Sequence, residues 1–258
     1  MNRTELIQST VDINTINLIL SPINLKIRSL IELNDGIILP KLVEILINKK
    51  ITKFKPNPSF FQKKQNIQFA LEELSAIDKT FNKDQFNLND EKKLIFLAST
   101  LLIKFYVVIP KRDLIIHISN LLKDFDISIK NMTKSFANGL LFIALLSKIS
   151  EGSIKYEDKG DINSNFNYIK SSCEILNIPF ILTIDCISSN PDENCNIIQS
   201  FIILKSIKNF DFSNPKIENK PPEKIDVQTS KIQNDTTSNI NLINIQSKIS
   251  TKITQYND

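Results

Sequence analysis

Apolar residues recur at helical spacing along most of the chain, from Ile13 to Phe212. Runs in which apolar and polar residues alternate, as they do in half-buried β-strands, are scarce. The chain is therefore predicted to be all-α. The longest apolar stretch, residues 94–110, is interrupted by polar residues and is shorter than the ~20 residues of a membrane-spanning helix. We expect a buried helix there.

The pattern changes after Asp211, where prolines break any helix and Ser, Thr, Asn and Gln dominate. Residues 213–239 are predicted to be a disordered linker, and 213–258 a tail without a packed core. A weak apolar stripe returns near the end, at spacings of three, four and four residues, and predicts either a frayed tail or a short helix for weak self-association. The stripe consists of Leu242, Ile245, Ile249 and Ile253.

An internal repeat divides the helical part of the chain. Residues 34–39 resemble residues 137–142, and residues 66–70 resemble residues 165–169, at offsets of 103 and 99 residues. Each unit of about 100 residues has the usual size of one domain. The boundary is expected near Pro110, because proline cannot continue a helix.

The repeated motif has a clear local interpretation. Asp35-Gly36 and Asn138-Gly139 each precede a leucine-rich segment. The side-chain oxygen of Asp35 or Asn138 can accept a free backbone N–H at a helix start. The glycine then permits close packing, and the following leucines are predicted to face the core. This signal is structural and reveals no activity.

Composition excludes several functions. Hydrophobic residues make up 41%, which is enough for a core, and the net charge of +4 comes without a dense basic run, so a nucleic-acid partner is not expected. The chain has four glycines, too few and too scattered for a P-loop or a dinucleotide fingerprint. No cofactor and no enzymatic activity are expected.

His117 is the single histidine and lies in an apolar helical stretch. We interpret it as a core or half-exposed residue rather than a general base, because no nucleophile motif accompanies it. Cys173, Cys186 and Cys195 are widely spaced and odd in number, which is typical of a reduced cytosolic protein. They lack the spacing of a zinc site, and no EF-hand loop is present, so no metal is expected. The first residues do not resemble a signal peptide.

The ordered motifs resemble the tandem calponin-homology (CH) module of the α-actinin, filamin, spectrin and fimbrin type. In the first unit the resemblance rests on residues 33–36 and on Asn66 to Leu71, which match an "N-φ-x-x-A-L" helix. In the second unit it rests on four segments in family order. These are residues 135–140, 176–182, 185–187 and 191–193. The resemblance implies two all-α CH domains, residues 10–108 and 111–212, in a non-enzymatic, actin-binding protein of the cytoplasm and cytoskeleton.

The sequence departs from the family at its tryptophans. Thr15 and Ser99 occupy positions where the family usually has tryptophan, Phe136 replaces a third, and the chain contains none. Pro40 is expected inside the first leucine-rich helix, where it would remove a hydrogen bond. These differences bear on the strength of actin binding more than on the fold.

The resemblance implies that actin is contacted by three helices, at residues 12–20, 90–105 and 112–123. Within the second of these, Leu94, Leu97, Leu101 and Phe105 form a core stripe. Its other face is also partly apolar, which predicts either a partner surface or burial under the second domain. The residues expected to contact actin are Asn14, Asn17, Lys92, Lys93, Phe96, Ser99, Thr100, Ile103, Lys104 and Arg112.

Two other functions remain open. One is a phosphoinositide-responsive membrane-surface adaptor, with Lys123, Lys130 and Lys134 as the available cations. The other is a divergent scaffold, similar to the parvins, that binds partner helices. The missing tryptophans favour the scaffold, whereas the short link at residues 107–113 resembles that of the actin-binding type.

Overall fold

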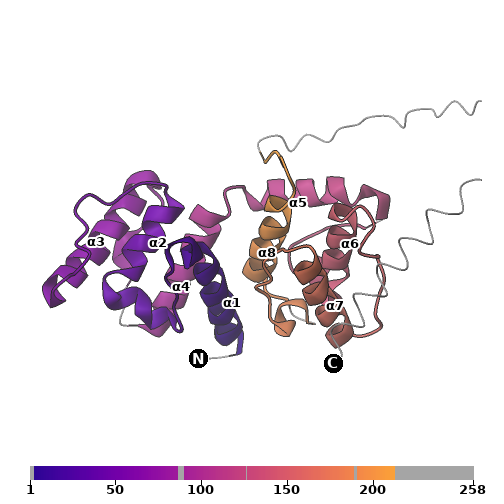
Figure 1. Ribbon diagram of the computed structural model, residues 1–258, viewed down its shortest axis with the longest axis horizontal. Coiled ribbons are helices and arrows are strands. Elements are labelled where there is room, and N and C mark those ends of the chain that lie inside the picture. Colours follow the sequence, from indigo (N-terminus) through magenta and orange to yellow (C-terminus); the bar gives the residue numbers. More distant parts are fainter. Residues whose placement is uncertain (1–2, 87–89, 126, 189–190, 213–258) are drawn as a thin grey trace, which may run out of the picture. The chain divides into compact units, whose positions relative to one another are not determined.

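The computed structural model describes residues 3–86, 90–125, 127–188 and 191–212, and the regular structure within these ranges is entirely helical (Figure 1). This confirms the all-α prediction. The predicted linker at 213–239 and the apolar stripe after it lie outside the described residues. The main helices of the described ranges are α1 (Arg3–Leu20), α2 (Ile38–Leu46), α3 (Phe60–Ile77), α4 (Glu91–Leu101), α5 (Lys111–Leu121), α6 (Leu140–Ile149), α7 (Ile162–Ile175) and α8 (Glu193–Lys205).

All described residues belong to one compact unit. Figure 1 shows α1–α4 (indigo to magenta) gathered as one set of helices and α5–α8 (pink to orange) as another. In the first set α1 packs on α2 and α4, and α2 packs on α3; in the second α6 packs on α5, α7 and α8. Helix α8 also contacts α1 across the two sets. The division into two domains therefore stays a prediction.

A buried asparagine holds the glycine turn of the first set. Asn66 of α3 donates from Nδ2 to the carbonyl oxygens of Gly36, at 2.9 Å, and Lys55, at 2.8 Å. Its Oδ1 accepts from the Lys55 backbone N–H at 3.0 Å. Because Asn66 is fully buried, these bonds are needed to satisfy its amide, and they fix the turn and the loop before α3 at once.

Asn165 of α7 does the same in the second set. Its Nδ2 donates to the carbonyl oxygen of Asn138 at 3.0 Å, and its Oδ1 accepts from the Lys159 backbone N–H at 2.8 Å. Asn165 lies 99 residues after Asn66, at one of the offsets found in the sequence. The repeat in sequence is thus a repeat of the same hydrogen-bonded clamp, which we call the asparagine clamp.

Asp35 and Asn138 accept backbone N–H groups at the starts of the helices that follow, as predicted, although the N-cap residues themselves are Ile37 and Gly139. Oδ1 of Asp35 accepts from the backbone N–H groups of Ile37, at 2.7 Å, and Ile38, at 2.8 Å. Gly36 adopts a left-handed conformation with φ of 78°, and a Cβ there would lie 2.5 Å from Cα of Lys63. In the second set Asn138 accepts from the Leu140 N–H at 3.2 Å.

Pro40 does not have the effect expected of it. Helix α2 begins at Ile38, so Pro40 is its third residue. Backbone N–H groups in the first turn have no partner within the helix, so proline removes no bond there. The expectation of a lost hydrogen bond is wrong, because the helix starts only two residues before the proline.

Helix α1 starts earlier than predicted, at Arg3 rather than at residue 12. The extra turns are polar in composition, but Gln8 within them is buried, and its Nε2 donates to Oδ1 of Asp12 at 2.7 Å. Polar residues that bond one another inside a core do not show in a hydropathy pattern. The first predicted domain boundary, at residue 10, therefore falls within a helix.

The predicted closing helix, residues 90–105, is shorter than expected. Asp90 caps its start, accepting from the Lys92 and Lys93 backbone N–H groups at 3.0 and 3.4 Å. The α-helix ends at Leu101 and a π-helical turn, η4 (Leu102–Tyr106), follows. The core stripe is fully buried at Leu94, Leu97 and Leu101, whereas Phe105 in the turn is only half-buried.

We predict that Gly36→Ala destabilises the protein by on the order of 3 kcal/mol, because the new methyl group meets the Lys63 backbone in addition to the left-handed strain. Gly152→Ala is the matched control. Gly152 has φ of 85° but open space around it, so only the strain of about 1 kcal/mol should remain. Urea unfolding of the two variants measures the difference. Equal losses would show that the close approach of α3 contributes nothing.

Candidate functional site

The candidate functional site is the outer face of α4, and it begins at the first turn of this helix. Lys92 and Lys93 are both exposed there, and Nζ of Lys92 lies 3.1 Å from Oε1 of Glu5 on α1. Phe96, one turn later, is 55% exposed. The predicted lysines and the phenylalanine thus lie on the outer side of the helix, while the leucine stripe faces inward.

An aromatic stack supports Phe96. Its ring lies 5.7 Å from that of Phe86, and Phe86 lies 5.1 Å from Phe81, both pairs nearly parallel. Phe81 and Phe86 are buried. Such stacking restrains the exposed ring, so Phe96 presents a fixed apolar surface.

Lys104 is exposed but already bonded within the chain. Its Nζ donates to Oδ2 of Asp78 at 2.8 Å and lies 2.6 Å from Oγ1 of Thr80. The hydrogen bond from Lys104 lowers the pKa of the Asp78 carboxyl to about 2, with Thr80 adding to the effect. This arrangement fixes the ammonium group at the end of the face, where a further acidic partner can still approach it.

A hollow of about 390 Å³ opens between these residues. It brings together most of the predicted residues of α4 and the turn η4 with the segment before α4 and the first turn of α8. Its lining consists of Thr80, Phe81, Gln85, Phe96, Ser99, Thr100, Ile103, Lys104 and Asn194. Asn194 places α8 at one edge of this face, but the second half of the chain does not cover Phe96, which is 55% exposed.

Ser99 is not a surface contact. It is 9% exposed, and its hydroxyl donates to Oδ2 of Asp12 at 2.8 Å. The expected exposure of Ser99 is wrong, because α1 covers this side of α4 and supplies a carboxyl group for the hydroxyl. Ser99 instead forms part of the floor of the hollow.

Asp12 is a fully buried carboxyl group. Burial raises its pKa to about 7, although the hydrogen bonds from Ser99 and Gln8 oppose the rise, and the nearby carboxylate of Asp192 adds to it. Near neutral pH the group therefore exists in both charge states. In the neutral form its O–H can donate to the Ser99 hydroxyl, which both donates and accepts.

The same network reaches the second set of helices. Sγ of Cys195 on α8 lies 3.9 Å from Oε1 of Gln8. A hydrogen bond with Cys186, together with burial, raises the pKa of the Cys195 thiol. Cys173, Cys186 and Cys195 are all free and buried, and burial raises the pKa of Cys173 to about 12. Thiols that stay protonated are poor nucleophiles, so Cys173 and Cys195 are structural. Hydrogen bonds with Cys195 and Thr183 instead lower the pKa of the buried Cys186 thiol.

The two asparagines predicted on α1 are both bonded within the chain. Asn14 donates to the carbonyl oxygen of Ile181 at 3.3 Å. Asn17 donates to the Ile27 carbonyl at 2.9 Å and accepts from the Ile27 N–H at 2.7 Å. Asn17 therefore fixes the loop after α1, and a contact of either side chain with a partner stays a prediction.

The remaining predicted cations are exposed. Arg112 lies in the first turn of α5, whereas Lys123, Lys130 and Lys134 lie in the loops and turns between α5 and α6. Nothing in the structure assigns them a ligand, so their predicted roles stay predictions.

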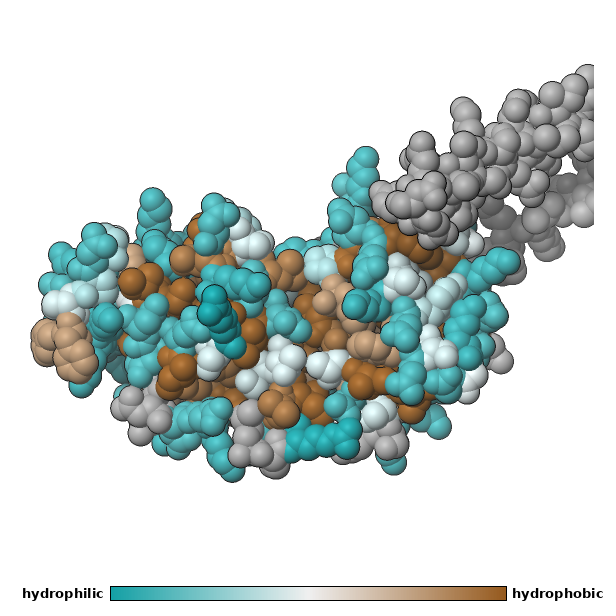
Figure 2. Space-filling model, turned by 60° about the horizontal axis from the view of Figure 1, so that its bottom comes forward, coloured by the Kyte–Doolittle hydropathy of each residue, from teal (hydrophilic) through white to brown (hydrophobic). Residues whose placement is uncertain are grey.

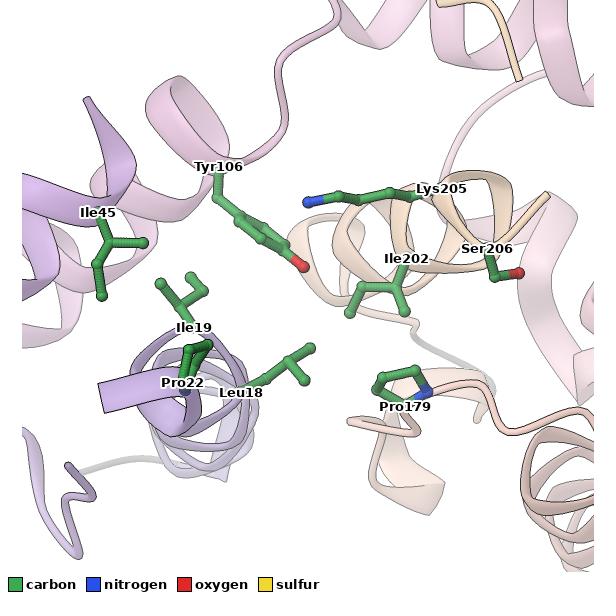
Figure 3. Close-up of a pocket in the computed structure, with 9 residues that line it drawn as sticks. All are labelled: Leu18, Ile19, Pro22, Ile45, Tyr106, Pro179, Ile202, Lys205 and Ser206. Atoms are coloured by element: carbon green, nitrogen blue, oxygen red, sulfur yellow. The ribbon is translucent and has the colours of Figure 1, made fainter. Parts of the chain in front are cut away.

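A second hollow, of about 400 Å³, lies where α1, α2, the turn η4 and α8 meet (Figure 3). Tyr106 and Lys205 point toward one another across it, with Nζ of Lys205 lying 5.2 Å from the centre of the Tyr106 ring. Burial raises the pKa of Tyr106. The other lining residues are mainly apolar, and they are Leu18, Ile19, Pro22, Ile45, Pro179, Ile202 and Ser206.

His117 is buried and its ring meets Phe210 and Phe212 edge-on, at 5.2 and 6.2 Å. This confirms its interpretation as a core residue. Within the described ranges no cluster of His, Cys, Asp and Glu could hold a metal ion. In the same ranges no single helix is long and apolar enough to cross a membrane, although α4 with its turn and α5 pass that test as a pair bent by 61°.

Sequence reasoning missed the buried polar residues of this region. Gln8 and Asp12 are four residues apart, and Asp12 is in helical register with the buried Ile16 and Ile19. A carboxylate on an otherwise apolar helix face was the signal in the sequence that could have indicated a buried polar group. The hydrogen-bonding partner, Ser99, lies 87 residues later and could not be paired with it from spacing alone.

Residues 109–207 match the calponin homology (CH) domain family. Two curated relatives from Dictyostelium discoideum are similar at low identity. Interaptin is 27% identical over 214 residues, which cover 72% of this chain and 12% of interaptin. Cortexillin-1 is 28% identical over 142 residues, which cover 49% of this chain and 32% of cortexillin-1. The chain thus spans less than a third of the length of either relative.

The family match bears on the second half of the chain. It begins just before α5 and ends just after α8, and it overlaps most of the predicted second domain, residues 111–212. The resemblance found in the sequence is confirmed there. For residues 10–108 it stays a prediction.

We predict an unusual pH dependence of stability from Asp12. Its pKa is raised on folding, so the native protein keeps a proton that the unfolded chain releases above about pH 4. The free energy of unfolding should therefore fall as pH rises from about 4 through about 7 and then level off. Asp12→Asn, which mimics the neutral group, should lack this slope in urea titrations.

Asp84→Asn is the control for this experiment, because Asp84 is exposed in the short turn η3 (Lys83–Gln85). It should keep the slope of the parent. The lowered pKa of Asp78 changes the free energy of unfolding only below about pH 4, outside the pH range in which Asp12 acts. A parent protein whose stability is constant between about pH 5 and about pH 8 would contradict the assignment to Asp12.

Proposed function

We propose that this chain is a non-enzymatic, cytoskeletal protein that binds filamentous actin through a tandem CH module. The first domain would comprise residues 10–108, extended to Arg3 by the observed start of α1. The second would comprise residues 111–212. The proposal places the protein in the cytoplasm, on the cytoskeleton.

The asparagine clamp supports the tandem arrangement. It occurs once in α1–α4 and once in α5–α8, on the third helix of each set, and each copy holds a turn that contains glycine. The family match at 109–207 covers the second copy. A shared device at a shared place in two sets of four helices supports a shared fold for both.

The observation that carries the actin-binding proposal is the fixed, exposed ring of Phe96. It lies beside the hollow on α4, and exposed lysines stand at both ends of this surface. An aromatic anchor surrounded by cations suits a partner that combines an apolar contact with acidic groups. The face belongs to the helix that the family resemblance identifies as an actin contact.

The structure refines the proposed contact residues. We propose Lys92, Lys93, Phe96 and Thr100 on α4, Ile103 and Lys104 in the turn η4, and Arg112 at the start of α5 as the contacts. Ser99 acts as the floor of the hollow through its bond to Asp12. Asn14 and Asn17 would act by holding α1 and its loop in place.

The test is co-sedimentation of the full chain with filamentous actin at low and at physiological salt. Phe96→Ala should weaken binding by about tenfold or more at both salt concentrations, because it removes an apolar anchor. Lys93→Glu should weaken it by on the order of tenfold at low salt and by less at high salt, because salt screens the charge.

Matched controls lie on α7, where Ile175 is 72% exposed and Lys170 is exposed. Ile175→Ala and Lys170→Glu make the same kinds of change away from α4 and should bind like the parent. Folded Phe96 and Lys93 variants that sediment as well as the parent would exclude α4 as the contact. Absence of binding by the parent would remove the actin proposal altogether.

A scaffold that binds partner helices is the second candidate. The hollow beside Tyr106 favours it, because it is mainly apolar, at about 400 Å³, and bordered by a lysine. A partner helix seated there would require Leu18 and Ile202. Loss of partner-peptide binding by Leu18→Glu, with actin sedimentation unchanged, would separate the two functions. Charge reversal of Lys123, Lys130 and Lys134 in the vesicle experiment below tests whether these lysines contact an anionic bilayer.

A further inference from the structure

Two adjacent phenylalanines protrude at the start of α3. Phe60 is 78% exposed and Phe61 is 68% exposed. Neighbouring residues on a helix point about 100° apart, so exposure of both means that the helix end itself stands out into solvent. Figure 2 shows pale brown side chains at this end of α3, at the left edge, bordered by hydrophilic residues.

The first turn of α3 is firmly built. Ser59 and Gln62 form a reciprocal capping box around the two phenylalanines, in which each side chain bonds the backbone N–H of the other residue. The loop before it is tied to α3 by the asparagine clamp through Lys55. The exposed rings are therefore presented by a fixed structure.

The segment around these rings is strongly basic. Between residues 45 and 71 the chain has no acidic residue, and it has six lysines. These are Lys49, Lys50, Lys53, Lys55, Lys63 and Lys64. The whole chain has a net charge of +4, so the remainder of the chain is net negative. Although the lysines form no dense run, the net positive charge is concentrated in this segment, which the sequence analysis did not recognise.

Several of these lysines are available to a partner. Lys55 and Lys64 are exposed and form no ion pair within the described part of the chain. Nζ of Lys64 lies 5.3 Å from the centre of the Phe60 ring, so charge and apolar surface are in contact. The nearest acidic residues along α3 are Glu72 and Glu73, and Glu72 lies eleven residues, or about 17 Å of helix, beyond Phe61.

We propose that this tip of α3, formed by Lys55, Phe60, Phe61, Lys63 and Lys64, docks on the surface of an anionic phospholipid bilayer. The two rings enter the boundary between headgroups and acyl chains, and the ammonium groups contact the lipid phosphates and carboxylates. Aromatic side chains favour this boundary, and basic residues next to it are attracted to anionic lipids.

A bilayer fits the geometry better than a protein partner. Two rings that protrude in different directions from a convex helix end need a receiving surface that adapts to both. A fluid bilayer does so, whereas a protein needs a matching concave site. The tip lies at the start of α3 and in the loop before it, and none of its residues lines the hollow beside α4. Lys123, Lys130 and Lys134 lie between α5 and α6, in the other set of helices. The chain could then bind a filament and a bilayer at once.

The first test uses the full chain and vesicles of phosphatidylcholine with or without phosphatidylserine. The parent should bind the anionic vesicles at least about tenfold more tightly. Phe60→Ala with Phe61→Ala should weaken that binding by about tenfold or more, and Lys55→Glu with Lys64→Glu should abolish the preference for phosphatidylserine. Ile175→Ala and Lys170→Glu, on α7, should bind like the parent.

The absence of tryptophan from the chain allows a second, conservative test. Phe61→Trp introduces one fluorophore at the tip, and its emission should shift to the blue only with anionic vesicles. Ile175→Trp should show no shift. These variants keep a large apolar side chain, so a folding defect cannot explain the result.

Three outcomes would overturn the proposal. The first is equal binding of the parent to both kinds of vesicle. The second is loss of binding in the triple variant Lys123→Glu, Lys130→Glu and Lys134→Glu but not in the tip variants, which would assign the bilayer to the other cations. The third is tip-dependent binding to polyglutamate without any binding to vesicles, which would assign the tip to an acidic protein.

Discussion

The buried side-chain amide is the interaction on which the rest of this fold depends. In each set of helices one asparagine bonds both a glycine turn and the loop that precedes its own helix, and thereby sets the position of the third helix against the second. A buried amide that lost one of these partners would leave a polar group without compensation, which is expensive inside a core. The clamp therefore specifies one arrangement, whereas the surrounding Leu and Ile residues would accept several.

The features of the fold that could be predicted from sequence are those that depend on residues close together in the chain. The all-α class, the cap at Asp35 and the leucine stripe of α4 depend on residues that are close in sequence, and pattern analysis found them. The early start of α1 and the end of α4 at Leu101 depend on tertiary contacts of Gln8 and on a π-helical turn, which periodicity does not encode. Pro40 was misjudged because a shift of a few residues in a helix start changes the cost of proline from large to small.

In the candidate site, too, some positions could be predicted from helical register and others depend on tertiary contacts. Lys92, Lys93 and Phe96 were expected on the surface from helical register, and they are there. Ser99 was expected beside them, but it faces a buried carboxylate that belongs to a helix 87 residues earlier. Register places a side chain on a face of its helix, whereas only the packing of other helices decides whether that face is open. The aromatic tip of α3 illustrates the reverse case, since Phe60 and Phe61 resemble core residues in sequence and lie in solvent.

Ser99 has a further consequence for chemical selectivity. The resembled family usually has tryptophan at this position, whereas here a small hydroxyl forms the floor of a hollow of about 390 Å³. That volume is in the range of sites that accept small organic molecules. A compound shaped to reach Ser99 would collide with an indole ring in relatives that keep the tryptophan, so it could discriminate this protein from them. Thermal-shift screening of the parent against Ser99→Trp would identify such compounds, because only the parent should respond.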